Sequence, residues 1–392
     1  MQKIRANQAA LIQGAFCLIA LVSFAASLFH IFRHTHHYQW DLKVYFRAPV
    51  DYAMGIDPYK VSSFVYPPLF LSVFGLISRF LSYGRFFALV LWAKTVCFAA
   101  LLWLWKKTFL QNVPIGFFLL FAWFGFNATV LLDFQAGNIS VFEATLLFLA
   151  FAAFLRKNTA LFVSFVLIAA SFKLAPISFL ILLLLDTPRR TKAFFVGCAA
   201  YVAFGLVNFF LFPELTRAFL EEALVRISES GVICPSSLAF FGDAVNAFGQ
   251  ALGLGSLSFV SKILYFIFAG WILFVSGKSW LTWGAGRPMR ADGRAFLVLF
   301  TILTFVLVTP RMKDYAYILA IPSVLFAVQN FKISVPKWLF FLPLVLIPKG
   351  AAWPQPFEIV FIEFWGYGPL LLALFFWVIY LKELRSISVE GP

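Results

Sequence analysis

Residues 159–185 read TALFVSFVLIAASFKLAPISFLILLLL, a run of 27 mostly apolar residues with a single charge, Lys173, near its centre. Pro176 follows that lysine by three positions. A lysine in the middle of a lipid-facing helix costs about 2.5–3.5 kcal/mol, and a proline removes a helical hydrogen bond. The run is therefore either one ordinary membrane span or two short helices that separate near Lys173. In the second case each half is about 20 Å long, and the break lies within the membrane, buried in protein or lining a cavity.

The composition of the whole chain indicates a membrane protein. Of its 392 residues, 62% are hydrophobic and 12% are charged, against about 45–50% and about 25% in a soluble domain. A water-soluble fold of this composition lacks the polar surface to cover its apolar side chains. These values exclude intrinsic disorder, a coiled coil and a secreted disulfide scaffold, and they predict an all-α polytopic membrane protein.

Other apolar runs of suitable length are distributed along the chain. They lie at residues 9–32, 86–105, 114–132, 139–155, 191–212, 259–276, 295–309, 315–330, 337–348 and 359–381. The first is too long for the apolar part of a signal peptide, so we interpret it as a retained span. The run 66–81 begins with Pro67-Pro68 and contains Arg79. It is short for a bilayer core of about 30 Å, so we expect it to lie along the outer membrane face.

The charges decide between the two topologies. If 66–81 and 159–185 were both ordinary spans, four cations would fall outside the cell: Lys106, Lys107, Arg156 and Lys157. If instead the first lies on the surface and the second is broken, all four are inside, as the positive-inside rule prefers. The net charge of +14 is then explained by topology rather than by nucleic-acid binding.

We therefore expect about twelve membrane segments with both termini in the cytoplasm. The first outer loop spans residues 33–85 and carries juxtamembrane helices, and the second large outer loop spans 213–258, with a surface helix in PELTRAFLEEALVRI. The sequence contains no visible internal repeat and no low-complexity linker. Residues 1–392 are accordingly expected to form a single integral-membrane domain.

The first outer loop contains the best candidate for chemistry. It reads WDLKVYFRAPVDYAMGIDPYK over residues 40–60, followed by FVYPPLF over 64–70. Asp41 lies soon after the first span, at the membrane–water interface, where a carboxylate can act as a general base on a hydroxyl. The alternative is that Asp41, Asp51 and Asp57 are ordinary solvated loop acids.

Polar residues in and beside other spans form a second group of candidates. A cation at membrane depth indicates function, but Lys173 can also reach the interface or pair with an acid such as Glu143. Asp133, Gln135 and Asn138 lie in a short link between two spans. Their side chains either hydrogen-bond a sugar or cap the next helix.

Residues 309–315, TPRMKDY, place cations on the expected outer face. Arg311, Lys313 and Tyr315 are suited to holding an anion, since the arginine fork matches phosphate. The alternative is a pair of interfacial anchors.

The sequence predicts no metal or cofactor. His30, His34, His36 and His37 are close in sequence, and an interfacial polar cluster is favoured over a metal site, which needs further ligands. There is no DxD pair, Walker loop, GxSxG or HExxH motif. A soluble nucleotide-sugar or ATP site is therefore unsupported.

Three motifs in order resemble glycosyltransferase family 87: Asp41-Leu-Lys-Val-Tyr45, Gly55-Ile-Asp57-Pro58-Tyr59 and Tyr66-Pro67-Pro68. The link at 135–138, the Lys173-x-x-Pro176 element and the loop at Pro310 are also similar, so the resemblance covers about residues 38–320. It implies a GT-C fold and a bacterial cytoplasmic-membrane enzyme whose active site faces the periplasm or exterior.

The resemblance also implies a reaction. A sugar, mannose or another hexose or pentose, passes from a polyprenyl-phosphate donor to a hydroxyl of a lipid- or glycan-linked acceptor, with inversion. Asp41 is the implied catalytic base, and no metal or other cofactor takes part. The implied substrate-binding residues are Trp40, Tyr45, Asp57, Tyr59, Tyr66, Gln135, Asn138, Lys173, Arg311, Lys313 and Tyr315. Besides the donor and acceptor, only membrane lipids are expected as partners, and no nucleic acid.

Other classes of function remain open at the level of sequence. A transporter or flippase of polyprenyl-linked sugars or lipids would use the same basic grooves, but it would place polar residues near the membrane midplane in related halves. A non-enzymatic scaffold would tolerate replacement of Asp41. A glycan polymerase or ligase would use a lipid-diphosphate donor and a large outer loop in the second half.

Overall fold

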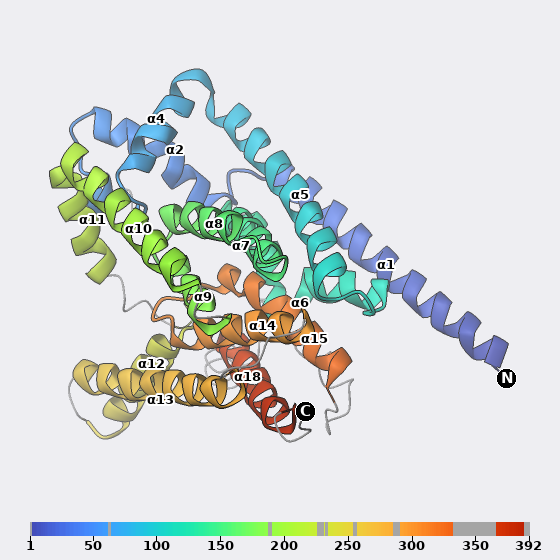
Figure 1. Cartoon of the computed structure of the whole chain (residues 1–392). Coiled ribbons are helices and arrows are strands. Elements are labelled where there is room, and N and C mark those ends of the chain that lie inside the picture. The colour runs from blue at the N-terminus through green and yellow to red at the C-terminus, as the bar shows by residue number, and fades with distance from the viewer. Residues whose placement is uncertain are drawn as a thin grey trace. The chain divides into compact units, whose positions relative to one another are not determined.

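The computed structural model describes residues 2–61, 64–186, 190–225, 231, 234–253, 257–284, 291–331 and 366–387. Every regular element in these ranges is an α-helix or a short 3-10 helix (η), as Figure 1 shows. The predicted all-α class is confirmed for this part of the chain.

Helices follow one another along both halves of the chain. The first half comprises α1 (Gln2–Arg33), α2 (Trp40–Ala53), α3 (Pro58–Val61), α4 (Leu69–Phe80), α5 (Tyr83–Thr108), α6 (Ile115–Ala136), α7 (Ser140–Leu155), α8 (Thr159–Phe172), η1 (Ala175–Leu180) and α9 (Ile181–Asp186). The second half comprises α10 (Thr191–Leu211), α11 (Pro213–Val225), α12 (Ser237–Ala251), α13 (Ser258–Gly284), α14 (Ala291–Val308), η4 (Asp314–Ala320), α15 (Ile321–Asn330) and α18 (Gly368–Ile387).

The chain divides into two compact units, and α1 and α6 contribute to both. We call Leu21–Thr108 with Leu131–Arg226 the Asp41 unit. We call Met1–Ala20 with Phe109–Val130 and Ile227–Pro392 the Arg311 unit. The expectation of a single domain over residues 1–392 stays a prediction.

The core of the Asp41 unit is centred on α7, which packs against both α5 and α8. Most of its side chains are buried, and its phenylalanine rings contact rings of neighbouring elements. Trp105 of α5 meets Phe148 edge to face at 5.4 Å between ring centroids, and Phe151 meets Phe179 of η1 at 5.1 Å. Such edge-to-face pairs stabilise the core. The buried α7 therefore forms a rigid support for the residues at its two ends.

The run 159–185 is broken at its lysine, as the two-helix interpretation predicted. Helix α8 ends at Phe172, and Lys173 has extended backbone angles, φ −135° and ψ 136°. The 3-10 helix η1 then begins at Ala175 with Pro176 in its first turn, where a missing N–H costs nothing. The break brings the Lys173 side chain back toward the start of α7.

The predicted first outer loop, 33–85, contains three short helices, α2, α3 and α4. Helix α4 begins directly after Pro67-Pro68 and has 12 residues, too few to cross a bilayer. It packs against α2. The expected helices of this loop are therefore present, and their position along the membrane surface stays a prediction.

Within the described residues five helices are long and apolar enough to cross a membrane: Asn7–Arg33, Tyr83–Thr108, Ile115–Ala136, Thr191–Leu211 and Ser258–Thr282. The apolar windows of the first and fourth are only 11% buried, so these helices present apolar surface outward, as contact with lipid requires. These features indicate a multi-pass membrane protein. The number of twelve segments stays a prediction, since five shorter apolar helices are also present. The predicted span 337–348 and part of 359–381 lie outside the described residues.

Two features were not predicted. Helix α6 contains a left-handed turn at Phe126, Asn127 and Ala128, whose φ angles are 54°, 57° and 56°. Within the Arg311 unit, Phe126 stacks on Tyr317, and Thr129 donates to the main-chain oxygen of Asp314. In the predicted second outer loop, 213–258, α11 is the helix expected from the sequence, and the additional helix α12 was not predicted.

Candidate active site

The first turn of α2 carries Asp41, whose side chain is half-buried. The helix starts after Gln39, which has the left-handed φ of 65°. The Gln39 main-chain N–H donates to the Gln135 carbonyl at 2.6 Å, and its side-chain amide donates to the Phe134 carbonyl at 2.6 Å. We call these two bonds the Gln39 clasp. It ties the start of α2 to the end of α6 and so fixes the backbone that carries Asp41.

The turn between α6 and α7 depends on Gly137. Its φ is +69°, a conformation that favours glycine. A Cβ at this position would meet the side-chain oxygen of Gln39 and lie 2.8 Å from the Cβ of Leu42. Glycine therefore allows the turn to approach α2 closely, and the next residue, Asn138, faces Asp41.

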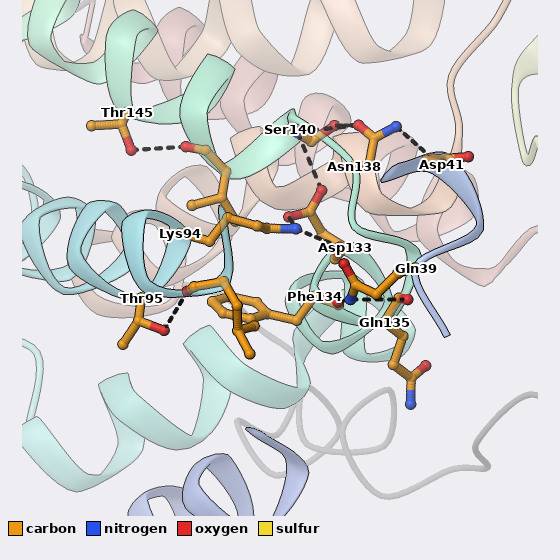
Figure 2. A network of polar contacts seen from close by, with 12 residues as sticks. Gln39, Asp41, Lys94, Thr95, Asp133, Phe134, Gln135, Asn138, Ser140 and Thr145 are labelled. Carbon is orange, nitrogen blue, oxygen red and sulfur yellow. Dashed lines mark hydrogen bonds and ion pairs between the residues drawn. The ribbon is translucent and has the colours of Figure 1, made fainter. Parts of the chain in front are cut away.

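Asn138 connects this turn to the candidate base. Its side-chain nitrogen Nδ2 donates to the Asp41 carboxylate oxygen Oδ2 at 2.6 Å, and to the Tyr45 hydroxyl at 3.1 Å. Figure 2 shows the Asn138 amide between Ser140 and Asp41. Within the described residues, the other carboxylate oxygen of Asp41 accepts no hydrogen bond from the protein. A half-buried carboxylate held through one oxygen has the other available to a substrate hydroxyl.

Buried tyrosines lie beside the candidate base. The hydroxyls of Tyr45 and Tyr66 lie 2.6 Å apart, and Tyr59 donates to the Tyr66 main-chain oxygen at 2.8 Å. Burial, with a smaller contribution from the negative charge of Asp41, raises the pKa of Tyr66 far above its usual range. Burial first, then Asp57, raises the pKa of Tyr59 in the same way. Both phenols therefore stay protonated and keep their capacity to donate hydrogen bonds.

A fully buried ion pair lies behind the turn. Lys94 of α5 and Asp133 of α6 are 1% and 0% exposed, and the Lys94 Nζ lies 2.7 Å from Asp133 Oδ2. Lys94 also donates to the Asp133 main-chain oxygen at 2.6 Å and lies 5.0 Å from the centre of the Phe134 ring. The other carboxylate oxygen of Asp133 accepts from the Ser140 N–H at 3.2 Å. Sequence reasoning missed Lys94, although a lysine within the apolar run 86–105 gave the same signal as Lys173.

Lys173 reaches this network from the broken run. Its Nζ lies 2.6 Å from the Glu143 Oε2 and donates to the Ser140 hydroxyl at 2.9 Å. The pairing with Glu143 that the sequence left open is therefore present. Ser140 was not singled out from the sequence, yet it contacts Asp133, Asn138 and Lys173.

The remaining candidates of the Asp41 unit lie at the margins of the network. Trp40 is 46% exposed beside Asp41. Asp57 accepts from the Tyr59 N–H at 2.9 Å and lies 3.8 Å from the Lys60 Nζ, so it stabilises the start of α3. Gln135 contributes its main-chain oxygen, and its side chain points away from the network in Figure 2. Among the loop acids, Asp41 joins the network, while the buried Asp51 lies 3.4 Å from Arg47 on its own helix.

The Arg311 unit holds the other candidates. Arg311 and Lys313 lie in the short segment between α14 and η4, and Tyr315 lies in the first turn of η4; all three are half-buried. Their proximity follows from the sequence, and their approach to Asp41 stays a prediction.

The four histidines gather where α1 leads into α2. The rings of His36 and His37 lie 4.0 Å apart, and those of His30 and His34 lie 4.6 Å apart. Among the described residues, no group of three or more His, Cys, Asp or Glu is arranged to hold a metal ion.

An all-helical membrane protein with a half-buried carboxylate, oriented by a buried polar network, has the features of a membrane-embedded enzyme. Comparison with protein families matches residues 64–310 to glycosyltransferase family 87, and the chain belongs to this family. No curated protein and no solved structure matches it. The protein is therefore a membrane glycosyltransferase that takes a sugar donor and an acceptor.

The family match includes much of the site. Tyr66, Lys94, Asn138, Ser140 and Lys173 lie within it. Two sets of predicted site residues lie outside it: Trp40, Asp41, Tyr45, Asp57 and Tyr59 before it, and Arg311, Lys313 and Tyr315 after it. The role of Asp41 therefore depends on the geometry around it.

Proposed function

We propose that the protein transfers a sugar, mannose or another hexose or pentose, from a polyprenyl-phosphate donor to a hydroxyl of a lipid- or glycan-linked acceptor. The observation that carries this proposal is the 2.6 Å hydrogen bond from Asn138 to Asp41. It holds a half-buried carboxylate in a fixed orientation among buried tyrosines. A positioned carboxylate of this kind is suited to removing a proton from an alcohol.

Asp41 acts as the general base. It accepts the proton of the acceptor hydroxyl while the hydroxyl oxygen bonds to the anomeric carbon and the polyprenyl phosphate leaves with the bonding electrons. A phosphate needs no proton to leave, so one base is enough. A single displacement inverts the anomeric configuration, as in other one-step glycosyl transfers. Trp40, Tyr45, Tyr59 and Tyr66 line the path of the sugar and acceptor.

Cations neutralise the charge that develops on the leaving phosphate. Arg311 and Lys313 are proposed for this role, with Tyr315 as a further donor, because an arginine binds phosphate through two parallel bonds. Lys173 is held by Glu143 at 2.6 Å, so we assign it to the electrostatics of the site rather than to direct contact with phosphate.

The charge distribution of the Asp41 unit supports catalysis on the outer side. Lys94 pairs with Asp133, which contacts Ser140 at the start of α7. Trp105 contacts Phe148 further along α7, so α5 and α7 run in the same direction. Both helices end in cations, namely Lys106, Lys107, Arg156 and Lys157. Helix α7 is about 24 Å long, so the site and the basic end are separated by most of a bilayer. The positive-inside rule then favours a position for Asp41 at the outer face of a bacterial cytoplasmic membrane.

The proposal is tested with purified protein in lipid nanodiscs. A panel of radiolabelled polyprenyl-phosphate sugars is supplied together with an extract of membrane lipids, and products are separated by chromatography. The native protein is expected to form a labelled product, and the Asp41→Asn variant is expected to form far less of it. In a second preparation, with the protein in sealed lipid vesicles, movement of the donor across the bilayer without any product would instead indicate a transporter. Equal product from Asp41→Asn would indicate that Asp41 is not the base.

A further inference from the structure

The geometry points to Ser140 as a positioning residue for the reaction. We propose that Ser140 sets the orientation of the Asn138 amide, and through it the orientation of the Asp41 carboxylate. The inference rests on the proposed role of Asp41 as base. Ser140 does not contact Asp41 itself, and its influence passes through Asn138.

The first step of the argument is the Ser140 main chain. Its N–H donates to the Asn138 side-chain oxygen Oδ1 at 3.1 Å. A backbone N–H is always a donor, so the atom of Asn138 that faces it must be the oxygen. The amide nitrogen then points in the opposite direction, toward Asp41 and Tyr45.

The second step is the Ser140 hydroxyl. Lys173 Nζ lies 2.9 Å from the hydroxyl oxygen, and an ammonium group can only donate. The Ser140 oxygen therefore accepts from Lys173, and its proton is left for Asn138 Oδ1, which lies 2.9 Å away. Glu143 holds the ammonium at 2.6 Å. The Asn138 oxygen thus receives two hydrogen bonds from one residue.

The third step is the buried charge behind the turn. Asp133 Oδ1 shares the Ser140 N–H at 3.2 Å, and Lys94 pairs with the other oxygen at 2.7 Å. Because Lys94 and Asp133 are fully buried, this anchor is shielded from water. Ser140 therefore lies between two lysines, Lys94 acting through Asp133 and Lys173 acting directly.

The orientation of the Asn138 amide decides whether its contact with Asp41 is attractive or repulsive. With Nδ2 toward the carboxylate, the 2.6 Å contact is an attractive hydrogen bond to a charged acceptor. If the amide were reversed, its oxygen would face the carboxylate and repel it. Ser140 supplies a hydroxyl bond that favours the productive orientation, so its loss should reduce turnover without affecting donor binding.

The test uses three variants of the full-length protein. Ser140→Ala removes the hydroxyl, and Ser140→Thr keeps it. Ser323→Ala is the matched control, because Ser323 is also fully buried and donates one bond to a main-chain oxygen, that of Leu299, within the Arg311 unit. We expect Ser140→Ala to lower kcat about 10- to 100-fold, the range for a hydrogen bond in a charged network. The donor KM should change less than about twofold, since the lost bond orients the base rather than the donor.

Ser140→Thr is expected to restore most of the turnover, and Ser323→Ala to leave it unchanged. A second measurement does not need turnover: the rate at which Asp41 reacts with a carbodiimide at one fixed pH, read by mass spectrometry. The Asn138 amide covers one oxygen of the Asp41 carboxylate, so a less firmly held amide should raise this rate in Ser140→Ala and not in Ser323→Ala. Native kcat and an unchanged carbodiimide rate in Ser140→Ala would overturn the inference, as would a loss of turnover that only follows loss of folding. If the native protein gives no product with any donor, the proposed function fails, while the carbodiimide rate still decides the role of Ser140.

Discussion

The side-chain nitrogen of Asn138 donates a 2.6 Å hydrogen bond to the Asp41 carboxylate, joining two residues that are 97 positions apart in the chain. Asp41 lies on the short helix α2, in the predicted first outer loop, and Asn138 lies in the turn between α6 and α7. The candidate base is therefore positioned by a distant part of the chain.

Replacement of the base is expected to stop the reaction. Asp41→Asn keeps the shape of the side chain and removes its ability to accept a proton. Transfer should fall on the order of 100- to 10,000-fold, the usual contribution of a general base, while the unfolding temperature stays close to the native value. The rate of labelled product formation measures the effect. Glu221→Gln, at an exposed position on α11, is the control and should transfer at the native rate.

The buried ion pair should be more sensitive to the loss of one partner than of both. Lys94→Met leaves the Asp133 carboxylate charged and buried, which costs about 3–5 kcal/mol in comparable cases. Lys94→Met combined with Asp133→Asn removes both charges and should recover much of that free energy of unfolding. Tryptophan fluorescence during denaturation in detergent provides the measurement. If Lys94→Met alone proved as stable as the native protein, this result would contradict the burial of the ion pair.

Gly137 should not tolerate a side chain. In Gly137→Ala the left-handed φ of +69° is unfavourable, by about 1–2 kcal/mol, and the new Cβ meets Gln39 and Leu42. We expect lower stability and, because Asn138 is the next residue, slower transfer. Gly205→Ala in α10 has nothing within 4 Å of the added Cβ, so it should be neutral or stabilising by up to about 1 kcal/mol. Equal thermal stability of the two variants would argue against the tight approach of the turn to α2.

Arg311 is expected to bind the donor phosphate. Arg311→Ala should raise the donor KM by about 10-fold or more, the range for one hydrogen bond to a charged group. Arg311→Lys should recover only part of the affinity, since lysine lacks the two-pronged geometry. Initial rates at varied donor concentration provide the measurement. Arg217→Ala, at an exposed position on α11, is the control, and an unchanged donor KM in Arg311→Ala would remove Arg311 from the phosphate site.

The proposed topology predicts which cysteines react from outside the cell. On a background without the four native cysteines, Lys107→Cys should resist a membrane-impermeant maleimide, because the end of α5 faces the cytoplasm. Lys60→Cys, at an exposed position in the first outer loop, should react readily. Mass shifts after labelling of intact cells give the result. Rapid labelling at position 107 would contradict the proposed topology, because it would place the end of α5 outside the cell.

Local sequence signals predicted some of these features well. Lys173 and Pro176 lie close together in one run. A buried charge and a missing backbone N–H therefore both destabilise a continuous helix at the same place, and the helix ends there. The short helix after Pro67-Pro68 was predictable for the same reason, since a fixed φ favours a helix start. The candidate status of Asp41 came from its position in a polar loop.

Other features depend on contacts between distant segments. Lys94 has the same sequence signal as Lys173, but its partner Asp133 comes from another helix, and no local pattern indicates which residues pair. The left-handed turn at 126–128 opposes the preference of Phe126 and Ala128 for right-handed helix. Packing against Tyr317 and Asp314 of the same unit accompanies it. Reasoning from single residues could not find these features.

The Gln39 clasp has a consequence for biosynthesis. It joins Gln39 to Phe134 across 95 positions, and proteins emerge from the ribosome from the N-terminal end. A nascent chain that has not yet extended through α6 carries Asp41 on a segment with no clasp to hold it. The segment that carries Asp41 therefore reaches its native position only after the later helices have been synthesised. A variant with a weakened clasp is then expected to fold slowly and to be degraded early. These effects should be seen before any change in the activity of the folded enzyme.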